Sequence, residues 1–123
     1  MGQKAQEPEA LSPLTPAVFH ILLALADGEK HGYGIMKEVS QRTGGSMRMG
    51  PGTLYGSIRR MLASGLIEAT DERPDPEIDD ERRRYYRLTE FGLRVAQAES
   101  RRLDQLLQVA RTKHVLAPQG GFS

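Results

Sequence analysis

The 123-residue sequence contains no cysteine and no tryptophan. Without thiols, disulfide bridges, thiolate zinc sites and cysteine nucleophiles are excluded, and the fold must be held together by packing. Long apolar runs are also missing, since the longest, VFHILLALA, is far shorter than the roughly 20 residues that a membrane-spanning helix needs. The N-terminus lacks the basic-then-apolar pattern of a secretion signal. We therefore expect one small cytoplasmic domain with no membrane partner.

Patterns typical of catalysis and of metal binding are equally scarce. The three histidines, His20, His31 and His114, are scattered along the chain without the HxxxH spacing of a metal site. No serine is accompanied by a matched base, and no glycine-rich strand-to-helix loop suggests nucleotide binding. We expect a protein that is not an enzyme, with no catalytic residue, no metal ion and no cofactor.

A strong net charge is absent too, but the charges are segregated along the chain. The formal net charge is +1. Residues 30–65 carry six basic side chains and one acidic one, residues 66–81 carry one basic and eight acidic ones, and residues 82–87 carry four basic ones. Because salt screens each charge beyond roughly 8 Å, a local basic surface attracts polyanions even when the total is near zero. The two basic segments are therefore candidates for contacting a polyanion.

Capping signals predict two helices in the first third of the chain. Thr15 has the residue type of an N-cap, and Pro16 suits the first helical position, where its missing N–H is not needed. The apolar run that follows predicts a buried helix ending at Gly28. HGYGIMKEVSQRT predicts a second helix, with Tyr33 and Ile35 on or near its inner face, and a Gly-Gly pair ends it.

The stretch GPGTLYGSIRRMLASGLI predicts a third helix with an unusual outer side. Gly50 and Pro51 start this helix, and Gly65 ends it. Its apolar residues recur at helical spacing and form an inward stripe: Leu54, Ile58, Met61 and Leu62. The opposite side holds Gly52, Gly56, Arg59, Arg60 and Ala63, with Thr53 and Tyr55 at its margins. Small side chains let a helix backbone approach the major groove of DNA, where hydroxyls and arginines contact bases or phosphates.

The spacing of apolar residues changes after this helix. LIEAT and RRRYYRL alternate as strands do, and RPDPEIDDE between them reads as an irregular turn, so we expect a hairpin. Tyr86 should face the core and Tyr85 should face outward. Thr89 then caps a helix of about 23 residues, roughly 34 Å long.

This order of elements predicts a mainly α fold with a small β-hairpin. We expect a winged helix-turn-helix over residues 14–88 and a long C-terminal dimerisation helix over residues 89–114, with flexible segments at 1–13 and 115–123. A helix of this length projects beyond a small body, and a second copy of the chain would cover its apolar stripe.

The sequence resembles the PadR-like transcriptional regulators through LTPAVFHILLAL, HGYGIMKEV, GPGTLYGSIRRMLASGLI and RRRYYRLTEFG. The resemblance covers residues 14–107 and implies a homodimeric winged-helix repressor, with the GTLY helix in the major groove and the last helix forming the dimer. The matching positions are Gly32, Tyr33, Gly52 to Tyr55, and Tyr85 to Thr89. Gly50 stands where serine is common in the family, and Gly56 where proline is common. Glycine inside the helix loosens it by up to about 1 kcal/mol relative to alanine.

From the residues and the resemblance together we expect two sets of site residues. The DNA-binding set is Gly52, Thr53, Tyr55, Ser57, Arg59, Arg60, Lys37, Arg82, Arg83 and Arg84. The dimer-interface set is Phe19, Leu22, Ala96, Leu103, Leu106, Leu107 and Ala110. The expected partners are double-stranded operator DNA, a second copy of the chain, and a small-molecule effector whose identity the sequence does not indicate. Two-fold pairing would set the two reading helices one DNA turn apart, so the operator should be palindromic.

Two alternatives stay open at this stage. The arginines of the third helix can be an ordinary solvated face, and those of the hairpin can pair with the eight acidic residues that precede them. The whole chain can also be a winged-helix module that binds a protein and no longer reads DNA. Such a module would offer apolar anchors on its outer helix face, and GTLYGSIRR has few.

Overall fold

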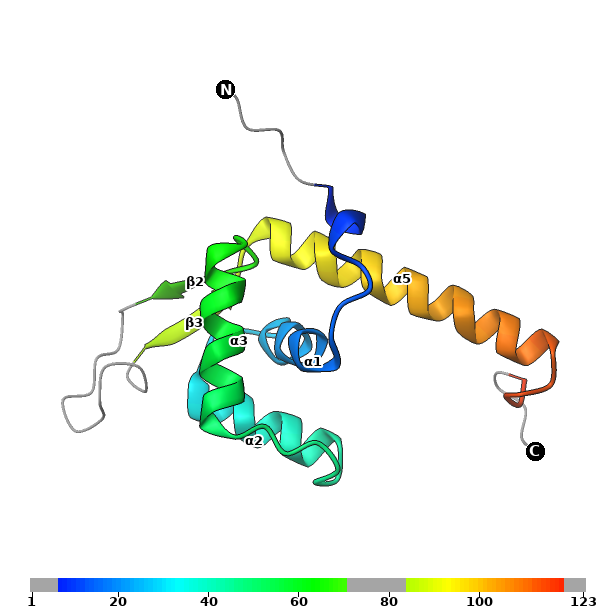
Figure 1. Cartoon of the computed structure of the whole chain (residues 1–123), viewed down its shortest axis with the longest axis horizontal. Helices are drawn as coiled ribbons and strands as arrows, with labels where there is room; N and C mark the ends of the chain where they lie inside the picture. Colours follow the sequence, from blue (N-terminus) through cyan, green and yellow to red (C-terminus); the bar gives the residue numbers. More distant parts are fainter. Residues whose placement is uncertain (1–6, 71–83, 119–123) are drawn as a thin grey trace.

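The computed structural model describes residues 7–70 and 84–118. Within these ranges the chain forms four α-helices, a 3-10 helix and three short strands (Figure 1). In chain order they are η1 (Pro8–Leu11), α1 (Pro16–Leu25), β1 (Lys30–His31), α2 (Gly32–Arg42), α3 (Pro51–Ala63), β2 (Ile67–Thr70), β3 (Tyr85–Leu88) and α5 (Glu90–Thr112). The mainly helical fold class and the long last helix are as the sequence predicts. The expected turn of the hairpin, with Arg82 and Arg83, lies outside the described residues.

Helix α1 lies at the centre of the core. It begins as predicted, because the Thr15 side chain accepts a hydrogen bond from the Val18 amide at 3.2 Å and Pro16 occupies the first helical position. Ile21 and Leu22 are fully buried. Contacts from α1 reach α2, α3, β3 and α5, which explains why its sequence is apolar on nearly every side.

The sheet has three strands rather than the two of the predicted hairpin. Strand β3 lies in the middle and pairs antiparallel with both neighbours, with Tyr86 opposite Lys30 of β1 and Ala69 of β2. Tyr86 is 2% exposed and packs in the core, as predicted from its alternation with Tyr85 and its position on the same strand face as Leu88. The sequence analysis missed β1 because two residues are too few to show an alternating pattern.

The end of α3 and the start of α5 are fastened to each other. Gly65 ends α3 with a φ of 77°, and the Leu66 amide returns to the Met61 carbonyl at 2.9 Å, which is the predicted glycine cap. The Thr89 hydroxyl donates to the Gly65 carbonyl at 2.6 Å and accepts from the Gly92 amide at 2.9 Å. One hydroxyl therefore caps α5 and holds the turn that follows α3.

Residues 8–14 are tied to α5, although most of them fall in the segment 1–13 that we expected to be flexible. Residues 8–11 form η1, which contacts α5. The Ser12 hydroxyl donates to Glu99 Oε1 at 2.9 Å, and the Leu14 amide donates to Glu99 Oε2 at 3.2 Å. Sequence reasoning missed this clip because its acceptor is 85 or more positions away along the chain.

The second half of α5 extends beyond the rest of the molecule (Figure 1). Its first half is covered by the body of the subunit, where Val95 and Ala98 are buried. Farther along, Leu106 is 53% exposed and Val109 is 51% exposed. The projection expected from helix length is therefore present.

Candidate nucleic-acid interface

Helices α2 and α3 are arranged as in a helix-turn-helix. Figure 1 shows α3 running across α1, with α2 beside the N-terminal end of α3. The inner side of α3 is fixed by Leu54, Ile58 and Met61, each at most 1% exposed. The opposite side of α3 is consequently turned to the solvent.

Four of the predicted DNA-binding residues share this outer side of α3. Gly52, Thr53, Arg59 and Arg60 are all exposed. Open space surrounds the Cα atom of Gly52, where an added Cβ would meet no atom within 4 Å. The Arg60 guanidinium donates to the Ser57 hydroxyl at 3.3 Å, which directs this side chain along the helix. The face is basic and has few bulky side chains near its N-terminal end.

Two predicted DNA-binding residues of α3 are misplaced, because the structure buries both. Ser57 is 1% exposed and Tyr55 is 8% exposed. Ser57 follows Leu54 by three positions and precedes Met61 by four, which puts it on the inner stripe. Tyr55 packs against α2, where an added Cβ on Gly32 would lie 2.8 Å from the Tyr55 Cζ atom. In this conformation neither side chain reaches a ligand on the outer face.

A groove lies between α2 and the N-terminal end of α3. Its volume is about 440 Å³. The lining residues are Tyr33, Met36, Lys37, Ser40, Gln41, Gly45, Arg48, Met49 and Gly50. Lys37, predicted as a DNA contact, is exposed here together with a second cation, Arg48. Sequence reasoning did not select Arg48 as a site residue, although its charge belonged to the basic segment 30–65.

Tyr33 also borders this groove, and its predicted inward position is wrong. The side chain is 56% exposed. Its ring stacks on that of His31 with centroids 6.4 Å apart, and the His31 ring meets Tyr85 edge-on at 5.3 Å. His31 is itself fixed, because its Nδ1 atom accepts the Gly34 amide at 3.0 Å and caps α2. A row of three rings thus connects α2 to strand β3.

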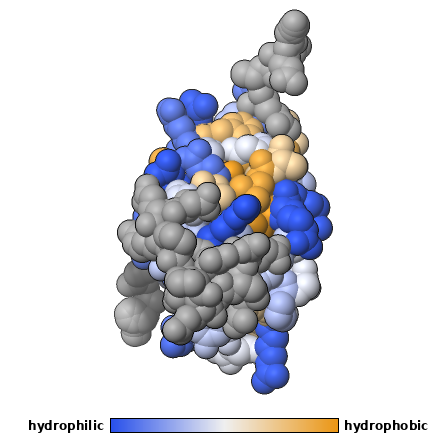
Figure 2. Space-filling view, turned by 90° about the vertical axis from the view of Figure 1, so that its left-hand side faces the viewer, coloured by the Kyte–Doolittle hydropathy of each residue, from blue (hydrophilic) through white to orange (hydrophobic). Residues whose placement is uncertain are grey.

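The described part of the wing shows charge pairing across the strands. Arg87 on β3 lies opposite Glu68 on β2, and its Nε atom donates to Glu68 Oε2 at 2.7 Å. Arg84 is exposed, whereas the predicted Arg82 and Arg83 lie outside the described residues. Seen from the side on which the strands lie, hydrophilic side chains surround an apolar area in the upper part of the face (Figure 2).

The predicted dimer-interface residues fall into two groups. Leu22 is fully buried in the core of its own subunit and Ala96 is 7% exposed, so the prediction that these two face a partner is wrong. Both belong to the parts of α1 and α5 that the subunit covers itself. The remaining members keep some exposure: Leu106 and Leu107 are exposed, and Phe19, Leu103 and Ala110 are half-buried.

A buried carboxylate on α5 was not predicted as notable. Glu99 is 2% exposed and accepts two hydrogen bonds from Arg102, at 2.9 and 2.7 Å, besides those from Ser12 and Leu14. The hydrogen bond from Arg102, aided by those from Ser12 and Leu14, lowers the pKa of Glu99 from its ordinary 4.5 to about 2, against the opposing effect of burial. Glu99 therefore stays charged at neutral pH and fastens the segment before α1 to α5.

Within residues 7–70 and 84–118, no three histidine, aspartate or glutamate side chains gather as metal ligands would. In the same ranges no helix has both the length and the apolar character required to cross a bilayer.

Comparison with known proteins gives this architecture a family. The sequence model of the "Transcriptional regulator PadR-like family" matches residues 21–98. The transcriptional regulator Rv3488 of Mycobacterium tuberculosis is 36% identical over 87 residues, which cover 71% of this chain and 75% of that protein. An uncharacterized protein of transposon TN4556 from Streptomyces fradiae is 35% identical over 86 residues, and this chain spans 22% of its length.

Solved structures share the fold. A PadR family transcription regulator from Clostridium difficile R20291 superposes with a TM-score of 0.66 at 24% identity, covering 80% of this chain and 97% of that one. The Bordetella bronchiseptica protein BpsR, whose DNA binding is regulated by 6-hydroxynicotinic acid, superposes with a TM-score of 0.60 at 25% identity, covering 91% of this chain and 70% of that one. With the family match over residues 21–98 and the winged-helix architecture, the chain belongs to the PadR-like family of transcriptional regulators.

Proposed function

We propose that this regulator is a cytoplasmic homodimeric repressor that binds a palindromic operator and is released from it by a small molecule. The observation that carries the proposal is the outer side of α3. There Gly52 and Thr53 leave the helix backbone accessible, and Arg59 and Arg60 are exposed on the same side. Such a surface suits a helix that enters the major groove, where an arginine gripping guanine contributes about 1–3 kcal/mol of discrimination.

The groove between α2 and α3 supplies the contacts that position this helix. Lys37 on α2 and Arg48 in the segment before α3 both line the groove and are exposed. Cations at this location contact phosphates on either side of the base edges that α3 reads, and phosphate contacts fix the register of a protein on the duplex. Tyr33 and Ser40 add hydroxyls to the same surface. We add Tyr33 and Arg48 to the proposed DNA-binding residues, and Arg84 stays in that set with Gly52, Thr53, Lys37, Arg59 and Arg60.

The second half of α5 is proposed to form the dimer. Its Leu106 and Leu107 are 53% and 44% exposed in the described subunit. Apolar side chains that project from a small body in this way are typical of an interface with another chain. A two-fold axis through paired α5 helices would set the two α3 helices roughly 34–36 Å apart, the spacing of successive major grooves on one side of DNA.

Release by an effector is supported by similarity alone. The DNA binding of BpsR is regulated by 6-hydroxynicotinic acid, which is a small organic acid. For the present chain we propose a small-molecule effector of unassigned chemistry. Screening for compounds that raise the melting temperature of the free protein and lower its DNA affinity tests this part of the proposal.

The decisive experiment is a fluorescence anisotropy titration of the protein against DNA from its own upstream region, repeated over a series of salt concentrations. We expect saturable binding that weakens steeply with salt. A plot of the logarithm of the binding constant against the logarithm of the salt concentration should have a slope of about −0.9 for each phosphate contact. Arg60→Ala should weaken specific binding by about 5-fold to 150-fold, as expected for loss of one arginine contact to a base. The matched control is Arg101→Ala, which removes the same charge from an exposed position on α5.

The outcomes separate the proposal from its alternative. Equal effects of the two substitutions would mean that charge alone matters and that α3 does not read the DNA. Absence of any salt-dependent binding would favour a winged-helix module that recognises another protein. The exposed face of α3 argues against that alternative, because an arginine pair and glycines offer little apolar surface to anchor a protein partner.

A further inference from the structure

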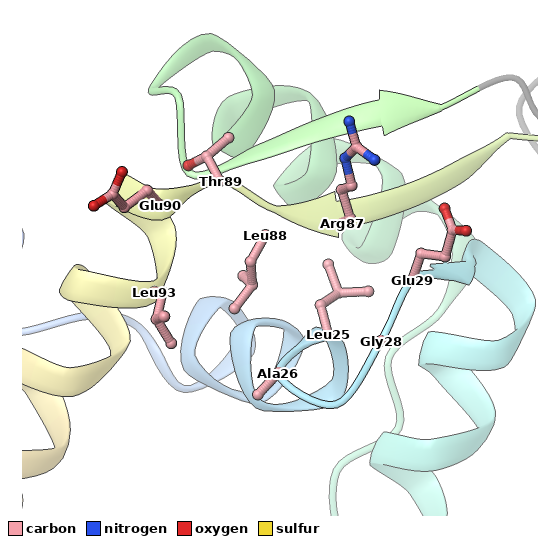
Figure 3. A pocket seen from close by; sticks show the side chains of 9 residues that line it. All are labelled: Leu25, Ala26, Gly28, Glu29, Arg87, Leu88, Thr89, Glu90 and Leu93. Carbon is pink, nitrogen blue, oxygen red and sulfur yellow. The ribbon is translucent and has the colours of Figure 1, made fainter.

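An apolar groove lies where α1 ends, β3 ends and α5 begins. Its volume is about 520 Å³. The lining residues are Leu25, Ala26, Gly28, Glu29, Arg87, Leu88, Thr89, Glu90 and Leu93. Figure 3 shows the leucines from α1, β3 and α5 around one central space, with Glu29 and Arg87 at one end and Glu90 at the other. Leu93 is 42% exposed, so the apolar wall of this groove is incompletely covered by the subunit itself.

A compact apolar turn lies at the opposite end of α5. His114 has a φ of 64°, and the Val115 amide returns to the Ala110 carbonyl at 2.8 Å while the His114 amide returns to Arg111 at 3.1 Å. These bonds form the glycine-type helix cap, here with a histidine in the left-handed position. The turn presents Val115 at 80% exposure, and Leu116 follows it at 37%. An exposed valine is thus held in a defined turn.

These two surfaces cannot meet within one chain. Leu93 and Thr112, the last helical residue, are about 28 Å apart along α5 by helix rise. In a symmetric dimer the turn of one copy can contact the groove of the other copy. The two-fold axis then produces the same contact a second time, with the two copies exchanged. If the two α5 helices run antiparallel, the end of one lies beside the beginning of the other.

The distribution of residues around α5 fits this antiparallel arrangement. Positions 93, 100 and 107 lie within about 40° of one another on the helix surface. They carry Leu93, the small Ser100 and the exposed Leu107. A small residue between two leucines lets two helices approach closely at their crossing point, with apolar contacts on both sides of it.

We propose that the C-terminal turn of a second copy, residues 113–116, occupies the groove between α1, β3 and α5, so that each subunit completes the apolar wall of the other. The proposal rests on the homodimer proposed above and specifies its register. It also extends the interface from α5 to strand β3, next to the wing.

Charges on the two surfaces are complementary. Glu90 stands at the rim of the groove with its side chain 83% exposed, and Glu29 lines the other end. The arriving segment carries Lys113 and is preceded by Arg111.

The absence of native cysteine makes disulfide trapping a direct test. The variant carrying both Leu93→Cys and Val115→Cys should form a covalent dimer on non-reducing gels after mild oxidation. Cα atoms joined by a disulfide lie roughly 4.4–6.8 Å apart, so a bond within one chain is impossible. Mixing the two single variants should also give a covalent dimer, whereas each single variant alone should not. Both positions are exposed, so the substitutions leave the core intact.

Lys37→Cys combined with Val115→Cys is the matched control. Lys37 is also exposed but lies on α2, which contributes no residue to the groove, so this pair should not cross-link. Cross-linking of the control pair to the same extent would overturn the proposal. Sedimentation equilibrium of the wild-type protein supplies the second measurement, and the DNA titration described above supplies the third.

The combined outcomes distinguish this inference from the proposed function. A dimer that binds DNA but does not cross-link through positions 93 and 115 overturns the groove arrangement and leaves the repressor proposal standing. Such a result would also leave the groove open to a small molecule. A monomer that fails to bind DNA overturns both. A covalent dimer formed only by the proposed pair, in a protein that does not bind DNA, supports the inference and overturns the function.

A charge exchange provides an independent measurement. Glu90→Lys and Lys113→Glu should each weaken the dimer several-fold, and the double variant should recover at least half of the loss, because the attraction is restored with the signs reversed. Two single effects that simply add would overturn the predicted contact.

Discussion

At the scale of single residues, two glycines are required by close packing rather than by backbone conformation. A Cβ on Gly92 would lie 2.9 Å from the carbonyl carbon of Leu66 and would overlap its oxygen. A Cβ on Gly32 would overlap the Tyr55 ring. Both glycines therefore act as contact points, one between α5 and the end of α3, the other between α2 and α3. Neither role is visible in the sequence, where a helical glycine looks like a weak point.

Gly92→Ala should destabilise the protein by about 2 kcal/mol or more, because the obstacle is backbone that cannot rotate away. Urea denaturation followed by circular dichroism measures the change. The matched control is Gly56→Ala, where the nearest atom to an added Cβ is the Arg60 guanidinium at 3.7 Å. That substitution should instead stabilise the fold by up to about 1 kcal/mol through helix propensity. Equal effects of the two would contradict the packing role of Gly92.

Glu99 gives a second prediction at this scale, on pH dependence. Its pKa is lowered in the folded protein, from 4.5 to about 2, so the folded state binds this proton less readily than the unfolded state. The stabilisation is thus fully present above about pH 4.5 and is lost as the pH falls from there toward 2. Glu99→Gln should unfold more easily at pH 7 by about 1.5–3 kcal/mol and lose less stability between pH 5 and pH 3 than the wild type.

Denaturant midpoints measured at several pH values check this prediction. An exposed carboxylate on the same helix, Asp104, provides the control, and Asp104→Asn should leave the slope between pH 5 and pH 3 nearly unchanged. Parallel pH profiles for the wild type and Glu99→Gln would show that other groups dominate acid unfolding.

At the scale of elements, the sequence predicts what local chemistry decides. Thr15, Gly65 and Thr89 act as the caps expected of them, since capping depends on neighbours within four residues. Strand β1 and the hydrogen bonds from Ser12 and Leu14 to Glu99 depend on partners that are distant in the sequence, so no local sequence pattern predicts them. The burial of Ser57 has a local origin instead, because its spacing from Leu54 and Met61 sets it on the inner side of α3, whereas its hydroxyl suggested an outer position.

The C-terminal cap of α5 yields a prediction for a single element. A non-glycine residue in the left-handed region costs about 1–2 kcal/mol, and His114 occupies that region. His114→Gly should therefore strengthen the cap and slow hydrogen exchange at the Val115 and Leu116 amides, both of which bond to the Ala110 carbonyl. His114→Val should do the opposite. Faster exchange in the glycine variant would mean that histidine contacts outweigh the backbone strain.

At the scale of the whole molecule, the proposed dimer and the proposed DNA binding are linked. Binding of one α3 helix to its half-site raises the affinity of the second α3 helix for the other half-site only while the two helices are held at a fixed spacing. Sequence reasoning identified the exposed leucines of α5 because their spacing is helical, but it also assigned Leu22 and Ala96 to the interface. That error was unavoidable from a single chain, since an apolar stripe does not show which portion its own subunit covers.

Leu107→Asp should raise the dimer dissociation constant at least about tenfold, since a carboxylate would then be buried in the apolar contact beside the crossing point of the two α5 helices. DNA affinity should fall in parallel, and sedimentation velocity together with anisotropy measures both. Gln105→Asp is the matched control, because it adds the same charge at an exposed position of the same helix. A monomeric Leu107→Asp variant that keeps full affinity for the operator would separate dimerisation from DNA binding.

The hydroxyl of Thr89 joins the last turn of α3 to the first turn of α5, since it donates to Gly65 and accepts from Gly92. We therefore expect α3 and α5 to move together in the proposed complex. If the half-sites of an operator are spaced slightly too far apart or too close, the distance between the two α3 helices of the proposed dimer must change. That change would have to come from the contact between the two α5 helices. A ligand that changes the angle between the two α5 helices slightly would displace both α3 helices by a larger distance, whatever site the ligand occupies.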